Sequence, residues 1–106
     1  MEIKIIKNPS PGTTEILRGR IHSKKIPTPE IVDTIGLVQG RMIEMIVAAD
    51  IAEKAVGVVV EDISGSCPQN MILLAIFGDT AAVESALNQI REKFSNGTYD
   101  FKGFDE

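Results

Sequence analysis

The sequence is poor in the residue types from which most reactive and metal-binding sites are built. Its 106 residues include one cysteine, one histidine, one tyrosine and no tryptophan. A single cysteine cannot form a disulfide within the chain, and structural zinc and iron–sulfur sites need three or four ligands. The histidine, His22, lies in a polar turn beside Lys24 and Lys25, where an imidazole is normally just solvated. No serine–histidine–acid arrangement can be argued with conviction, so we assign no catalytic residues.

Basic clusters, aromatic residues and long apolar runs are also scarce. The net charge is −4, and the aromatic residues are four Phe and one Tyr, so nucleic acid has little to bind to. The longest apolar run, Met71 to Phe77, is far too short to span a bilayer, and the N-terminus lacks the apolar core of a signal peptide. We therefore expect a cytoplasmic protein that binds neither nucleic acid nor membrane.

The composition and periodicity that are present fit one small globular domain of residues 1–106. Hydrophobic residues make up 43% of the chain, too many for a disordered protein. Apolar patterning predicts strands over 2–7, 13–21, 35–38, 58–60 and 71–77, and a weak last strand through Tyr99, Phe101 and Phe104.

Helical spacing and capping residues predict helices over 30–34, 41–56 and 81–94, the first capped by Thr28 and the last by Asp79 or Thr80. The predicted order is β-β-α-β-α-β-β-α-β, which contains a split βαβ arrangement. This order is typical of an α+β sandwich with the helices on one face of the sheet.

Several charged groupings have ordinary structural explanations. Asp50 and Lys54 are spaced i to i+4 on a predicted helix, which fits a surface ion pair. Glu61 and Asp62 are neighbours on a strand and should point to opposite faces, which does not favour a cation site.

Cys67 lies in the loop Gly65-Ser66-Cys67-Pro68-Gln69, between two apolar strands. Flanking Gly and Pro residues indicate that the thiol is displayed on a turn and is not packed in the core. As a catalytic thiol it lacks a base nearby in the sequence. If the thiol has a function, that function belongs to an assembly in which symmetry multiplies it.

From Thr34 to Phe94 the chain resembles the shell-forming domain of bacterial microcompartments (BMC domain). The resemblance rests on an ordered series of segments: Ile35-Gly36-Leu37-Val38, Ala48 to Ala55, Val58-Val59-Val60, Ser64-Gly65 and Ile76 to Leu87. The stretch from Ser10 through Ile21-His22 to Ile31 looks like the portion that ends the ordinary domain. Its place in front of Thr34 is similar to the circularly permuted subclass, which carries an extra N-terminal strand.

This resemblance implies an antiparallel sheet with packed helices, assembled into a flat cyclic hexamer with a central pore. It divides the chain into an N-terminal strand and turn (1–12), a permuted segment (13–34), a core (35–94) and a C-terminal strand or tail (95–106). Lys54, with Asp50 one turn before it, would lie at the hexamer edge. Ser64, Gly65, Ser66, Pro68 and Gln69 would form the pore loop around Cys67. The usual arginine-containing edge motif is replaced here by Ile21-His22-Ser23-Lys24-Lys25.

A narrower resemblance concerns the pore loop. Gly-x-Cys-Pro-Gln at this position is similar to permuted shell proteins of glycyl-radical-enzyme microcompartments, where it is associated with an iron–sulfur cluster. Six-fold rotation would turn Cys67 into a ring of six thiols. Because a cubane cluster has a three-fold but no six-fold axis, we expect alternate cysteines to bind three irons of one shared 4Fe-4S cluster. The fourth iron would then have a non-cysteine ligand or none, so the cluster would be labile in air.

The resemblance implies three kinds of partner: five further copies of the chain, other shell proteins, and an encapsulated glycyl radical enzyme with its activating enzyme. Three alternatives stay open at this point. One is a shell hexamer whose pore is free of metal and passes metabolites. Another is a cytosolic regulatory α+β domain that binds a small ligand. The third is a thiol enzyme.

Overall fold

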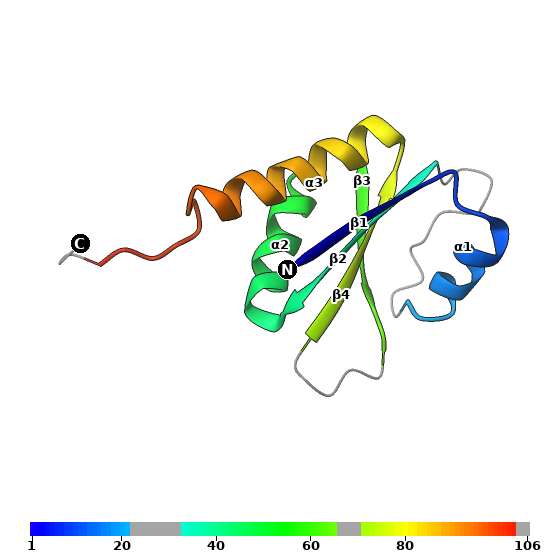
Figure 1. Cartoon of the computed structure of the whole chain (residues 1–106), viewed down its shortest axis with the longest axis horizontal. Coiled ribbons are helices and arrows are strands. Elements are labelled where there is room, and N and C mark those ends of the chain that lie inside the picture. Colours follow the sequence, from blue (N-terminus) through cyan, green and yellow to red (C-terminus); the bar gives the residue numbers. More distant parts are fainter. Residues whose placement is uncertain (22–32, 66–70, 104–106) are drawn as a thin grey trace.

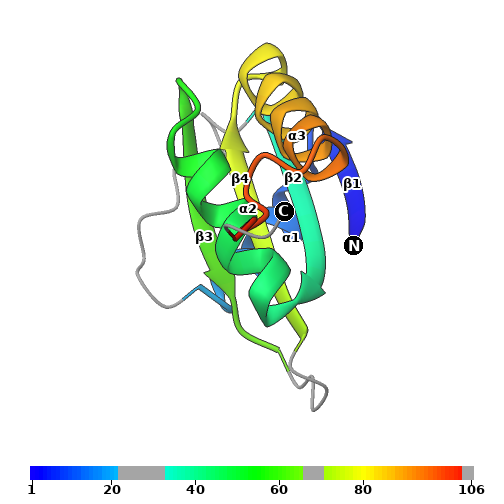
Figure 2. The same cartoon turned by 90° about the vertical axis from the view of Figure 1, so that its left-hand side faces the viewer.

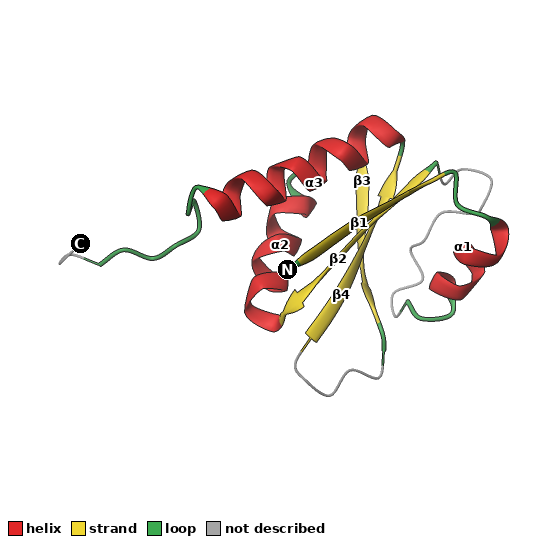
Figure 3. Ribbon diagram, in the orientation of Figure 1, coloured by secondary structure: helices red, strands yellow, loops and turns green. Residues whose placement is uncertain are grey.

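The computed structural model describes residues 1–21, 33–65 and 71–103. Within them the chain forms four strands and three helices, shown in Figures 1 and 3. In chain order these are β1 (Glu2–Lys7), α1 (Pro11–Arg18), β2 (Thr34–Arg41), α2 (Met42–Glu53), β3 (Val58–Ile63), β4 (Met71–Gly78) and α3 (Thr80–Ser95). The α+β class predicted from the sequence is confirmed.

The four strands form one antiparallel sheet in the order β1-β2-β4-β3. Strand β4 is therefore interior, which explains why Leu74, Ala75, Ile76 and Phe77 are all buried without polar interruption. Helices α2 and α3 cover one face of this sheet, and α1 lies on the opposite face (Figures 1 and 2). The two long helices predicted from the sequence lie on one face, as predicted, whereas α1, which was not predicted as a helix, lies on the other face.

Each sheet face carries its own apolar core. On the α2/α3 side, buried residues of both helices pack on alternate residues of β2 and β4, among them Val38, Met45, Leu74, Ile76, Val83 and Ile90. On the α1 side, the buried residues are Leu17, Ile21, Ile35, Ile63, Ala75 and Phe77. The N-terminal segment is therefore built into the domain by a core of its own.

The strand predicted over 13–21 is wrong, because Pro11–Arg18 is helical. Ser10 caps this helix: its Oγ accepts a hydrogen bond from the Thr13 backbone N–H at 3.2 Å, and Pro11 occupies the first turn. Thr14 and Leu17 are buried three residues apart, as a helix and not a strand requires. Of the predicted strand, only Ile21 forms a single bridge, to Ile63.

Two smaller predictions also differ from the structure. Thr34, placed at the end of a short helix, is the first residue of β2, while residues 30–32 lie outside the described part of the chain. The weak last strand is not formed, because Tyr99 and Phe101 follow α3 in turn and irregular structure. Phe104 lies outside the described residues.

Candidate functional site

The loop predicted around Cys67 lies in the sequence between β3 and β4. Its stem is fixed to the segment after α1: the Ser64 N–H donates to the Arg20 carbonyl at 2.8 Å, and Arg20 Nη1 donates to the Ser64 carbonyl at 3.4 Å. The Ile21–Ile63 bridge continues this contact. The segment that follows α1 thus contacts the end of β3, a contact that the sequence patterns did not reveal.

The predicted loop residues divide between described and undescribed parts of the chain. Ser64 and Gly65 lie at the stem, whereas Ser66, Cys67, Pro68 and Gln69 lie outside the described residues. Across residues 1–21, 33–65 and 71–103, no three His, Cys, Asp or Glu side chains gather closely enough to hold a metal ion.

The two predicted edge residues form a compact polar cluster with a third residue. Lys54 Nζ lies 2.8 Å from Asp50 Oδ2, and the Tyr99 hydroxyl donates to the same oxygen at 2.6 Å. The sequence analysis missed Tyr99, because it lies 49 residues from Asp50 and nothing in the local pattern connects them. The tail beyond α3 is thereby attached to the end of α2.

These contacts shift the pKa values of all three groups. The hydrogen bond from Lys54, and then that from Tyr99, lowers the pKa of Asp50. The bond to Asp50 raises the pKa of Lys54 and, with some desolvation, that of Tyr99. By linkage, Asp50 stabilises the cluster above its ordinary pKa and loses this effect as pH falls through its lowered value. Tyr99 contributes below its ordinary pKa and loses its effect as pH rises through its raised value.

We expect Tyr99 to ionise at a pH above the ordinary tyrosine value of about 10. Since it is the only tyrosine in a chain without tryptophan, tyrosinate absorbance during an alkaline titration reports on this side chain alone. The substitution Asp50→Asn removes the acceptor charge and should lower the midpoint towards the ordinary value. Glu53→Gln, on the same helix, is the matched control and should leave the midpoint in place; equal midpoints for Asp50→Asn and the native chain would contradict the cluster.

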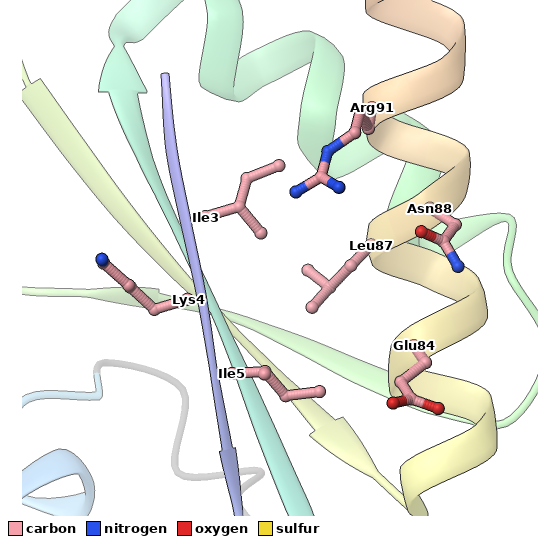
Figure 4. A pocket seen from close by; sticks show the side chains of 7 residues that line it. All are labelled: Ile3, Lys4, Ile5, Glu84, Leu87, Asn88 and Arg91. Carbon is pink, nitrogen blue, oxygen red and sulfur yellow. The ribbon is translucent and has the colours of Figure 1, made fainter.

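A groove between β1 and α3 is the place to look for a small-ligand site (Figure 4). Its volume is about 360 Å³, and Ile3, Ile5 and Leu87 form its apolar part while Lys4 points away from it. Glu84 at its rim is already paired with Lys7 at 3.1 Å. Ligand sites are usually concave and mostly apolar, with a few converging polar groups. This shallow groove with a charged rim gives little support to the small-ligand alternative.

No helix in the described ranges is both long enough and apolar enough to cross a membrane.

The fold and the sequence together define the class of protein. The BMC domain family matches residues 34–101, from the first residue of β2 to the tail beyond α3. The chain therefore belongs to the BMC domain family. Strand β1 and helix α1 precede the matched range, although both pack into the same domain.

Two solved structures are similar over most of their length. The ligand-free GrpU microcompartment shell protein from Clostridiales bacterium 1_7_47FAA is 54% identical, with a TM-score of 0.66 over 88% of this chain and 94% of that one. The ligand-free GrpU microcompartment shell protein from Pectobacterium wasabiae is 29% identical, with a TM-score of 0.65 over 85% of this chain and 99% of that one. No curated protein matches the sequence.

Proposed function

We propose that this protein is a structural, non-enzymatic component of a bacterial microcompartment shell in the cytoplasm, and that it works as a cyclic hexamer. The observation that carries this proposal is the 54% identity to a microcompartment shell protein over 88% of the chain. The loop 64–70 would surround the pore on the six-fold axis, and Lys54 and Asp50 would lie at the edge that meets neighbouring hexamers.

The arrangement of β1 and α1 supports a circular permutation. The family match begins only at residue 34, yet β1 pairs along its length with β2, from Glu2 opposite Gln39 to Lys7 opposite Thr34. Leu17 and Ile21 pack under the sheet in the second core. When the end of a domain is moved to its front, the moved segment lies outside the family match but still supplies a strand and a helix to the fold. Strand β1 and helix α1 fit this description.

We further propose that the ring of Cys67 thiols binds one iron–sulfur cluster, with three alternate subunits each donating one cysteine. Thiolates are the ordinary ligands of such clusters, and one cysteine per chain satisfies the requirement only through symmetry. When bound, the cluster would supply one-electron transfer or be handed on to enclosed enzymes. Pro68 and Gly65 would restrict and shape the loop, and Gln69 would donate a hydrogen bond to a cluster sulfur or a neighbouring loop.

The hexamer is tested by native mass spectrometry of the full chain. We expect one species of six times the 11.5 kDa chain mass. Substitution of Lys54 by Ala should leave that ring intact and abolish its ordered two-dimensional sheets in electron micrographs, because the edge loses its cation. The control is Lys102→Ala, because Lys102 lies outside the proposed edge; this variant should leave the two-dimensional sheets unchanged. A monomer or trimer for the native chain would refute the shell proposal.

A further inference from the structure

The chain turns sharply where α3 ends, and this turn fixes the direction of the tail. Gly97 has a φ of +68°, a left-handed conformation that glycine adopts without steric cost. The Thr98 N–H donates back to the Lys93 carbonyl at 3.1 Å. The Asp100 N–H donates to the Gly97 carbonyl at 3.0 Å. This is the Schellman type of helix end, and it holds Tyr99 where its side chain reaches α2.

Tyr99 adds a third group to the ion pair between Asp50 and Lys54. Its hydroxyl donates to Asp50 Oδ2 at 2.6 Å, and Lys54 Nζ lies 2.8 Å from the same oxygen. The side chains of Asp50 and Lys54 are 45% and 69% exposed. Ion pairs this exposed are usually weak, because two flexible side chains must be held in one geometry. The hydrogen bond from Tyr99 restricts the carboxylate and thereby favours the paired geometry.

In the proposed sheet, each edge of a ring meets the same edge of the next ring. Identical six-fold rings that tile a plane in one orientation touch across two-fold axes, so both sides of the contact present the same residues. Lys54 without a partner would bring like charges to both sides, and these repel. The Asp50 carboxylate offsets this charge within each subunit. Two neutral clusters can approach more closely than two uncompensated lysines.

We propose that Tyr99 is a positioning residue for the contact between rings: its hydroxyl holds Asp50 against Lys54, so that identical edges meet as neutral clusters. This inference rests on the proposed hexamer and its edge residues, and it adds a tail residue that lies 49 positions from Asp50 in the sequence. Without the hydroxyl, Asp50 is free to rotate away from Lys54, whose ammonium is then uncompensated at the contact. Tyr99 acts through these two side chains and does not have to touch the next ring itself.

The first test removes only the hydroxyl. Tyr99→Phe should keep the six-chain ring in native mass spectrometry. The protein concentration at which two-dimensional sheets appear, measured by sedimentation and electron microscopy, should rise about five- to tenfold, the equivalent of one hydrogen bond to a charged group. Thr98→Val is the matched control, because it deletes a hydroxyl from the adjacent residue, whose bond is to Asn96 within the tail. Its sheets should appear at the native concentration.

The second test uses salt to separate charge compensation from a merely structural effect. Asp50→Asn leaves Lys54 uncompensated, so its sheets should be absent at 0.1 M salt and return at 1 M, where the Debye length falls from about 10 Å to about 3 Å. The shift in concentration caused by Tyr99→Phe should likewise shrink at 1 M salt. Glu53→Gln removes the same charge from the same helix and should form sheets at both salt concentrations. Circular dichroism checks that all variants remain folded.

The outcomes distinguish this inference from the proposed function. Native sheet formation by Tyr99→Phe, or Asp50→Asn sheets that stay absent at 1 M salt where native sheets form, would overturn the role of Tyr99 and leave the shell protein standing. A native ring that forms no sheets would refute the edge contact on which the inference rests. A native chain that forms no ring would refute the proposed function itself.

Discussion

Substitution of Cys67 by Ser is expected to remove all bound iron from the protein. Native protein purified without oxygen should contain about four iron and four sulfide atoms per six chains, as one shared 4Fe-4S cluster requires. The serine variant should contain neither iron nor sulfide and should be colourless. Its ring should persist, because serine replaces only the sulfur atom of the side chain. Metal analysis, sulfide assay, visible absorbance and native mass check these outcomes together.

The neighbouring substitution Ser66→Ala is the matched control, because it changes the same loop by one oxygen atom and keeps the thiol. Iron content should be unchanged by it. The three-ligand arrangement has its own measurement: mild alkylation of the anaerobic ring should modify about three of the six thiols, and all six once the cluster is removed. Unchanged iron in Cys67→Ser would refute the ligand assignment. Absence of iron from the anaerobic native ring would favour the metal-free pore.

Replacement of Leu17 by Ala should destabilise the domain by about 2–5 kcal/mol, the usual cost of truncating a buried leucine. Leu17 is 8% exposed and packs with Phe77 and Ile21 in the core under α1. For a domain of this size each kcal/mol corresponds to a fall of about 4–8 °C in Tm. Thermal and urea unfolding followed by circular dichroism measure the change.

The adjacent residue provides the matched control. Ile16 is 66% exposed, so Ile16→Ala should change the free energy of unfolding by less than about 0.5 kcal/mol. The two substitutions truncate aliphatic side chains of equal size at consecutive residues. Their effects should differ only because Leu17 lies on the buried side of α1 and Ile16 on the exposed side. A larger loss for Ile16→Ala than for Leu17→Ala would mean that this segment is not the helix described here.

The elements with strong local patterns were correctly predicted from the sequence. The long helix over 81–94 has apolar residues at helical spacing and an N-cap at Asp79, whose Oδ1 accepts from the Ala82 N–H at 2.8 Å. The strand over 71–77 is apolar without interruption because it lies inside the sheet. In both segments the local preference and the tertiary environment favour the same structure.

The strand predicted over 13–21 is wrong because the local pattern of this segment is ambiguous. An eight-residue helix is too short to be stable alone, and its stability comes from packing and capping. The alternation around Ile16 and Arg18 resembles a strand, whereas the Ser10 cap and the burial of Leu17 favour a helix. The apolar core under α1 decides between them, and that core exists only once β2 and β4 are paired.

In the candidate site, too, some features follow from local sequence patterns and others only from long-range contacts. The sequence by itself determined that the chain has one thiol, that this thiol lies between two apolar strands, and that Asp50 and Lys54 are one helical turn apart, because these are properties of composition and local spacing. Only the tertiary structure brought Tyr99 to Asp50 and joined Ser64 to Arg20. Those features depend on contacts between residues tens of positions apart, which no local pattern encodes.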